Sequence, residues 1–298
     1  MASREKAVGI FFLSQTILGI LGNVALLCCL ILSNLSGNKA RPIDLIVKHL
    51  TCANILVLLC KGIPQSMAAF GQIYPLGNIS CKLVFYFHRV ARGVSLGATS
   101  LLSVFQAITI SPIISKWAQL KIRVPSIICP SLALCWILYL LINSFLITTV
   151  TNMNDKENLT DFRQSLYCVV VKLSKKSYVA YAIILASNDA MCLGLMTWAS
   201  GSMVLILFQH KQSIKHIHRS LSTKSSPEAK TTQRILILVC SFVVLYVTSV
   251  MLMMYFSFQD GTDTWVVSAN VAMSACFPTL CPFLLIRHYT RDLHPCSS

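Results

Sequence analysis

Seven long apolar stretches constrain this chain more than any other feature of its sequence. They cover residues 8–33, 45–68, 82–110, 127–149, 179–208, 235–256 and 264–286. A helix needs about 20 consecutive apolar residues to cross the ~30 Å hydrocarbon core of a bilayer. A membrane β-strand needs only about 10 residues and alternates in polarity. The unbroken runs therefore predict an all-α membrane protein built as a seven-transmembrane helix bundle.

The stretches between these runs leave no room for a soluble domain. The longest connections are residues 150–178 and 209–234. The chain is 55% hydrophobic and 12% charged, whereas ordinary soluble domains are about 45–50% apolar and about 25% charged. We therefore expect residues 1–298 to form a single seven-transmembrane domain.

The distribution of basic residues predicts how the bundle is oriented. With the N-terminus outside, the inner segments hold 14 Lys and Arg residues and the outer segments hold 7. Basic residues concentrate on the cytosolic side of membrane proteins. The tally predicts an extracellular N-terminus, a cytosolic C-terminus and a basic inner face that contacts anionic membrane lipid. Nucleic-acid binding is not expected, because it needs an exposed basic domain that this chain lacks.

The predicted outer surface carries two cysteines and one glycosylation motif. Cys81 stands at the mouth of the third span, and Cys168 lies in the loop before the fifth. Disulfides persist in an oxidising compartment, so the pair predicts a disulfide; the alternative is two free thiols. Asn158 begins an Asn-Leu-Thr motif in the same loop and is the expected N-glycan site.

Six short motifs occur in an order that is typical of one receptor family. They are Met67–Gly71, Cys81–Val90, Ser103–Pro112, Trp198–Met203, His210–Gln212 and Cys276–Thr279. Together they resemble the vomeronasal type-1 receptors, which are G-protein-coupled receptors for pheromones and related odours, over nearly the whole chain. Where that family often has Phe-Pro-Asp in the fifth helix, this chain reads Ser187-Asn188-Asp189.

The resemblance implies a function at each side of the plasma membrane. A small pheromone-like or odorant ligand would bind in the outer half of the bundle. A heterotrimeric G protein, of the inhibitory class, would be activated at the inner face. The basic residues beside the third and fifth spans are the predicted G-protein contacts: Lys116, Trp117, Lys121, Lys211 and Lys215.

Charged residues inside the spans point to the ligand site, because an ionisable group in a membrane span is costly and marks function by default. Asp189 lies about 15 Å into the fifth span, at about the depth of Arg92 in the third. The two could pair across the bundle, either as a packing device or as the floor of a pocket. We predict a ligand site from Arg92, Asp189, Arg89 and the aromatic residues Phe85 and Tyr255, although aromatic residues also gather at membrane interfaces without any ligand role.

Other classes of function fit the sequence less well. A bitter-taste-like chemoreceptor is the nearest alternative, and a small transporter or channel is the second. No nucleophile–base pair or phosphate-binding loop can be assembled, so we expect no enzyme and no cofactor. His210, His216 and His218 have no Cys or carboxylate beside them, and a solvated basic face explains them better than a metal site.

Overall fold

The computed structural model describes ten segments of the chain. They are residues 2–35, 41–71, 78–111, 118–151, 162–164, 169–171, 175–217, 236–237, 239–251 and 264–293. Six helices within them are long and apolar enough to cross a membrane, and a shorter apolar helix covers Val239–Met251. The predicted bundle of apolar helices is therefore confirmed, and the chain is a multi-pass membrane protein.

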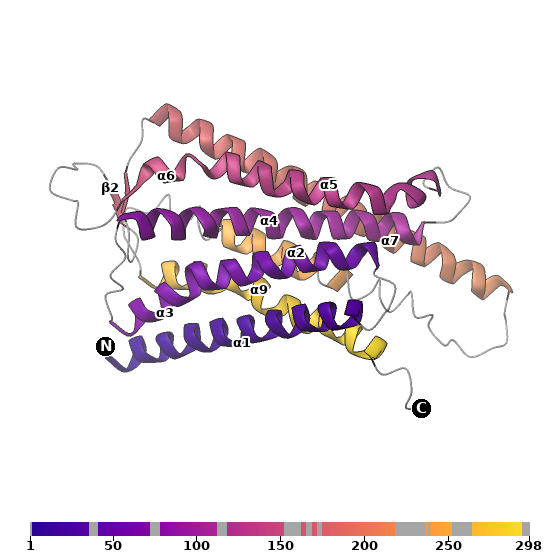
Figure 1. The fold of residues 1–298 in the computed structure, drawn as a ribbon, viewed down its shortest axis with the longest axis horizontal. Coiled ribbons are helices and arrows are strands. Elements are labelled where there is room, and N and C mark those ends of the chain that lie inside the picture. Colours follow the sequence, from indigo (N-terminus) through magenta and orange to yellow (C-terminus); the bar gives the residue numbers. More distant parts are fainter. Residues whose placement is uncertain are drawn as a thin grey trace.

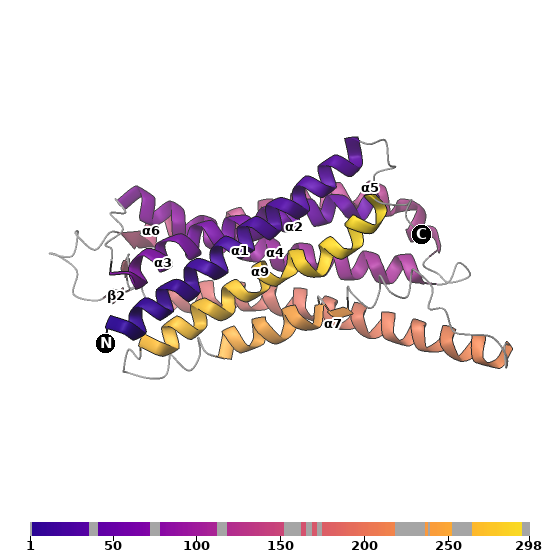
Figure 2. The same ribbon diagram turned by 90° about the horizontal axis from the view of Figure 1, so that it is seen from below.

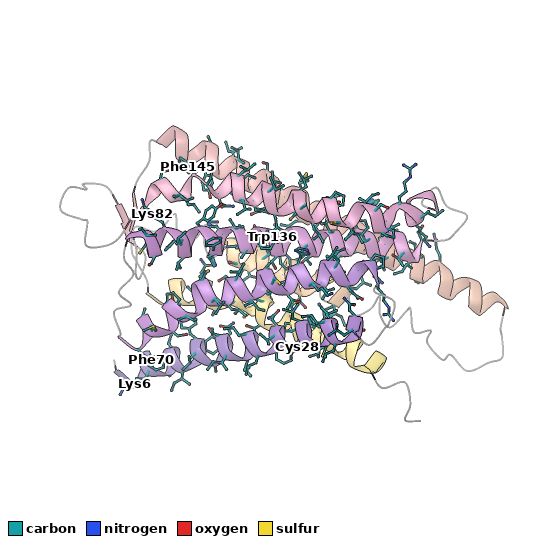
Figure 3. The ribbon with its side chains drawn as sticks, viewed as in Figure 1. Lys6, Cys28, Phe70, Lys82, Trp136 and Phe145 are labelled. Atoms are coloured by element: carbon teal, nitrogen blue, oxygen red, sulfur yellow. The ribbon has the colours of Figure 1, made fainter. Side chains whose placement is uncertain are left out.

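The helices run side by side along one axis (Figures 1 and 2). Their bounds are α1 (Ala2–Leu35), α2 (Pro42–Val57), α3 (Ile63–Ala69), α4 (Asn78–Ile110), α5 (Ala118–Asn143), α6 (Leu146–Thr149), α7 (Lys175–Ile217) and α9 (Thr264–Leu293). The start of α1 and the end of α9 lie at opposite ends of the bundle. In Figure 3, Lys6, Phe70, Lys82 and Phe145 all lie towards the end where α1 begins, which we call the N-terminal end.

Helix α4 is the central helix of the bundle. In its most apolar window 78% of the residues are buried, against 28% in α1 and 17% in α7. It packs against α2, α5 and α7. The peripheral helices expose large apolar side chains instead, such as Leu21 of α1 and Leu205 of α7. In water such a surface would be unfavourable, but lipid solvates it, which fits a membrane bundle.

Two glycines let α5 approach α4 closely. A Cβ atom added to Gly93 would lie 2.1 Å from the ring of Tyr139, and one added to Gly97 would lie 2.4 Å from the Cys135 sulfur. Small residues at helix contacts let two backbones come together in membranes, where packing drives association. The hydroxyl of Tyr86 donates a hydrogen bond of 3.0 Å to the Leu140 carbonyl across the same contact.

A hydrogen bond also joins α5 to α2. The indole N–H of Trp136, labelled in Figure 3, donates to Nδ1 of His49 over 3.1 Å. Such side-chain bonds between helices contribute about 0.6–2 kcal/mol in membranes. They fix the positions of α2, α4 and α5 relative to one another.

The second predicted span is one continuous helical segment that contains a widened, π-helical turn. The α-helix α2 ends at Val57, and Leu58–Gly62 form a π-helical turn, η1, before α3 begins at Ile63. Pro64 follows this turn. It has no N–H to give to the Cys60 carbonyl, and its ring crowds that carbonyl, so the helix widens at this point. The turn carries the basic residue Lys61.

One of the two prolines in α9 is accommodated by α1. Pro282 cannot donate to the Pro278 carbonyl, four residues earlier in the helix. The side-chain N–H of Asn23 donates to that carbonyl over 2.8 Å. This bond satisfies a backbone acceptor that would otherwise lack its helical partner in an apolar layer. Figure 2 shows α1 and α9 lying together along their length.

The predicted fourth and fifth spans differ from the structure at their ends. The stretch 127–149 was predicted as one span, but α5 begins at Ala118 and ends at Asn143, and the short helix α6 follows. Asn143 donates its side-chain N–H to the Tyr139 carbonyl, which competes with the backbone ladder at this point. Helix α7 extends to Ile217, well past the predicted end at 208, because residues 209–217 contain no Gly or Pro.

A small β-sheet lies in the loop predicted between the fourth and fifth spans. Its strands are β1 (Val150–Thr151), β2 (Phe162–Gln164) and β3 (Val169–Val171), in the order β1-β3-β2 and antiparallel throughout. Strand β1 contacts α4. The all-α prediction missed this sheet because the strands are only two or three residues long, too short for a periodic sequence pattern.

Candidate ligand-binding cavity

Three residues from three helices meet near the middle of the bundle. The Cζ atom of Arg92 in α4 lies 5.0 Å from the centre of the Tyr246 ring, in the helix Val239–Met251. The Tyr246 hydroxyl donates a hydrogen bond to the Asp189 carboxylate of α7. A cation over an aromatic face is attracted by the ring within about 6 Å. We call this arrangement the Arg92–Tyr246–Asp189 relay.

The relay replaces the direct contact expected between Arg92 and Asp189. Within the described ranges the two residues form no direct ion pair, and Tyr246 stands between them. The positive charges of Arg92 and Arg89 nevertheless both act on the Asp189 carboxylate. The two residues are therefore brought together as the depth comparison indicated, although their energetic coupling stays a prediction.

A cavity lies directly beside the relay. About 390 Å³ at this position is not filled by atoms, a figure that includes the open space beside the partly open cavity. Its polar walls are Arg92, Ser95, Tyr246, Ser249 and Ser274, and its apolar walls are Val57, Phe242, Leu245, Met273, Phe277 and Pro278. Sites for small molecules are lined mainly by apolar and aromatic side chains, with a few placed polar groups that fix the orientation of the ligand. This cavity has that composition.

Lys61 enters the same region from the π-helical turn η1. Its Nζ atom donates a hydrogen bond of 2.8 Å to the hydroxyl of Ser274, which lines the cavity. The positive charges of Arg92 and Arg89 repel a positive charge on Lys61. π-helical turns are rare and frequently mark functional sites. Here the widened turn carries a basic side chain beside the cavity.

Of the predicted ligand residues that the structure describes, only Arg92 lines this cavity; Asp189 and Arg89 are not part of its wall. Phe85 stands one helical turn before Arg89 in α4 and is partly buried, but it is not part of the cavity wall. Tyr255 lies outside the described residues. The ligand roles of both residues stay predictions.

The sequence interpretation missed Tyr246 and assigned no role to Lys61. Tyr246 falls in the middle of the predicted span 235–256, where aromatic residues have no interfacial role. That position was the signal that could have identified it. For Lys61 the signal was the charge itself, because a basic residue this deep in a span needs an explanation.

The described members of the predicted G-protein contacts lie on helix segments towards the end of the bundle opposite its N-terminal end. Lys121 of α5 donates a hydrogen bond to the Ser111 carbonyl at the end of α4. Lys211 and Lys215 were expected in a loop, but they belong to the last turns of α7. Lys116 and Trp117 lie outside the described residues. Figure 1 shows the end of α4, the start of α5 and the end of α7 on this side, with the last turns of α7 extending beyond the other helices.

The predicted outer-surface features fall largely outside the described residues. Cys168 and Asn158 are among these, whereas Cys81 is fully buried in the first turns of α4. Strand β3 begins at Val169, directly after Cys168, in the same sheet as β1, which contacts α4. The disulfide and the glycan stay predictions.

Apolar helices around a small, partly polar cavity define the class as a helical membrane protein with an internal cavity. Comparisons with known proteins narrow that class. The model of the vomeronasal organ pheromone receptor family matches residues 6–298. The "Vomeronasal type-1 receptor 4" of Pongo pygmaeus is 48% identical over 287 residues, which cover 96% of this chain and 95% of that protein.

Two further relatives span a wide evolutionary range. The "Vomeronasal type-1 receptor 3" of Homo sapiens is 43% identical over 293 residues, covering 98% of this chain and 94% of that protein. The "Olfactory receptor class A-like protein 1" of Danio rerio is 30% identical over 281 residues, covering 93% of this chain and 88% of that protein. This chain belongs to the vomeronasal type-1 receptor family, whose members are chemoreceptors of the G-protein-coupled type and not enzymes.

Proposed function

We propose that this protein is a chemoreceptor of the plasma membrane that binds a small organic ligand in the cavity and activates a heterotrimeric G protein. The observation that carries the proposal is the Arg92–Tyr246–Asp189 relay at the cavity wall. It joins α4, the helix Val239–Met251 and α7, so a ligand against Tyr246 touches the link between three helices. Ligand-binding residues on different helices are what a receptor needs to change how its helices pack.

The way in which a ligand would activate the receptor follows from the helices that line the cavity. Arg92 and Ser95 come from α4, Phe242 and Tyr246 from the helix Val239–Met251, and Phe277 from α9. A ligand shifts an equilibrium between two arrangements only through its different affinity for them. A ligand that favours one separation of α4 from Val239–Met251 would therefore favour one arrangement of their far ends.

The G protein would bind those far ends, at the cytosolic side. The basic residues Lys121, Lys211 and Lys215 support this site, together with Lys116 and Trp117, because charged residues on an exposed face steer and orient a partner. The inhibitory class of G protein is an expectation from the family. In this orientation the N-terminus, the Cys81–Cys168 disulfide and the Asn158 glycan would all be extracellular.

The proposal is tested by guanine-nucleotide exchange. Purified receptor in lipid nanodiscs is mixed with a purified inhibitory-class G protein and a panel of volatiles and steroids. We expect at least one compound to raise the exchange rate in a saturable way. The matched control is Ser202→Ala, because Ser202 lies on α7 away from the cavity and its hydroxyl donates only within its own helix, to the Trp198 carbonyl. A folded receptor that raises exchange with none of the compounds, and with no inhibitory-class G protein, would contradict the proposal.

A further inference from the structure

The basic residues around the cavity outnumber the acidic ones. The positive charges of Lys61, Arg89 and Arg92 repel one another. Of the ten acidic residues in the chain, only Asp189 falls within a predicted span. Three cations thus face one carboxylate in an apolar layer, where the repulsion between like charges is weakly screened.

The one carboxylate is already engaged. Asp189 accepts the hydrogen bond from Tyr246, and it interacts with the positive charges of Arg92 and Arg89. Lys61 has one hydrogen bond in the described part of the chain, to Ser274. Because an ammonium group has three N–H donors, Lys61 has two left to offer. Its charge has no carboxylate partner among the described residues.

A second polar group at the same place also lacks a partner. The Nε2 atom of His88 is buried and makes no hydrogen bond to the described residues. The charges of Lys61, Arg92 and Arg89 all act on it. A buried polar atom without a hydrogen bond lowers the stability of the fold. An anion beside Lys61 would accept the hydrogen bonds that its ammonium group has left to offer and would offset the excess positive charge.

Other parts of the cavity wall are apolar and aromatic. Phe242 and Phe277 form an edge-to-face pair with ring centres 4.3 Å apart, and both line the cavity. The cavity therefore has a cationic side, where Arg92 and Ser274 line the wall and Lys61 donates to Ser274, and it has a hydrophobic side. A molecule with an acidic head and an apolar body matches both.

We propose that the cationic side of the cavity binds the head of an organic monoanion, such as a carboxylate, while its apolar body packs against Phe242 and Phe277. The inference rests on the proposed chemoreceptor function and deepens it by naming the chemical class of ligand. Lys61, held by the π-helical turn η1, is the residue that sets the preference for a negative charge. Arg92 takes part through its place in both the cavity wall and the relay.

The first test is direct binding without a G protein, so that its failure can be told from a failure of signalling. The probes are 4-phenylbutyrate and hexanoate, each paired with its methyl ester. They are added to purified receptor in nanodiscs of neutral lipid, and the thermal unfolding midpoint is followed against concentration. We expect at least one acid to bind about tenfold or more tightly than its ester, which corresponds to about 1.4 kcal/mol. Equal binding of acids and esters, or binding of neither, would overturn the proposal.

A third arm of the experiment distinguishes an organic ligand from an inorganic anion. Sodium chloride is added at the same concentration as each acid, with the ionic strength held constant. We expect chloride to leave the unfolding midpoint unchanged. A rise equal to that given by the acids would mean that the site takes a small inorganic anion, and the proposal of an organic ligand would be wrong.

The second test separates recognition from structure at Lys61. The variant Lys61→Gln removes one of three mutually repelling cations, so its unfolding midpoint without ligand should equal or exceed that of the wild type. Its preference for acid over ester should fall about tenfold. The matched control is Lys82→Gln, the same change in α4 near the N-terminal end (Figure 3), which should alter neither property. A lower midpoint with an unchanged preference would make Lys61 a purely structural residue and overturn the proposal.

Discussion

Helices α4 and α7 each supply a charged residue to the relay, but the bundle surrounds them very differently. Helix α4 is enclosed by α2, α5 and α7 along much of its length. Helix α7 has the least buried apolar window of the six long helices, at 17%. The same contrast is visible at their glycines: Gly93 of α4 leaves no room for a methyl group, whereas a Cβ added to Gly194 or Gly201 of α7 meets nothing within 4 Å.

Because of this difference, we distinguish α4, whose position is fixed by its packing, from α7, whose position can change. Close packing on several sides specifies where α4 lies, since a well-packed interior has few alternative arrangements. Helix α7 exposes most of its apolar window, and its described contacts with the rest of the bundle include its packing against α4 and the Asp189–Tyr246 hydrogen bond to the helix Val239–Met251. A ligand that displaces Tyr246 would therefore shift α7 and the helix Val239–Met251 more readily than α4.

The largest effect is expected where a methyl group is added to the central helix. Gly93→Ala places a Cβ 2.1 Å from the Tyr139 ring, so α4 and α5 must separate. Surface expression should fall several-fold, because a loss of about 1–2 kcal/mol is enough for that. Gly194→Ala, the same change in α7, should leave expression unchanged or slightly raised, since Ala favours helices by about 1 kcal/mol over Gly. Equal expression of the two variants, measured by flow cytometry, would show that α4 is not the packed helix.

The next largest effect concerns the two charges of the relay. Removing one of a buried pair leaves the other uncompensated, at a cost of about 3–5 kcal/mol where water is excluded. Arg92→Gln and Asp189→Asn should each reduce the folded yield, and the double variant should lose less than the sum of the two. Fluorescence-detected gel filtration measures the yield. Additive losses would mean that Tyr246 separates the charges completely, and Arg89→Gln should then be tested with Asp189→Asn in a parallel cycle.

A smaller and more selective effect is expected at the predicted cytosolic end of α7. Lys211→Glu with Lys215→Glu reverses the charge of its last turns. Ligand-dependent nucleotide exchange should fall about tenfold, which corresponds to about 1.4 kcal/mol, while ligand affinity and surface expression stay as in the wild type. If expression falls together with exchange, these lysines orient the helix in the membrane and do not contact the G protein.

The smallest effect is expected in the loop that is predicted to be extracellular. Asn158→Gln should abolish the glycosidase-sensitive shift in gel mobility and leave ligand-dependent exchange unchanged, because the glycan would lie outside the bundle. Asn34→Gln is the matched control, since Asn34 begins the same type of motif on the predicted cytosolic side. Loss of the shift in the control instead of in Asn158→Gln would reverse the predicted orientation.

The sequence alone predicted the bundle but not its interior contacts. Length and hydropathy are sufficient to identify apolar helices, because the bilayer sets the number of residues needed to cross it. The depth of Asp189 and Arg92 could be counted along their helices, and the structure does bring these residues to one place. The rotation of each helix about its own axis cannot be counted in this way, so the sequence did not show that Tyr246 lies between Arg92 and Asp189. The π-helical turn before Pro64 was also missed, because proline predicts a kink without specifying its form.

The relay is tested most directly by nucleotide exchange with the Tyr246→Phe variant. Phenylalanine keeps the ring beneath Arg92 but removes the hydroxyl that donates to Asp189. The variant should reach the surface, and its ligand-dependent exchange should need about tenfold more ligand or reach a lower maximum, because the link from α4 to α7 is broken. Exchange with the potency and the maximum of the wild type, at equal expression, would show that the Arg92–Tyr246–Asp189 relay does not transmit ligand binding.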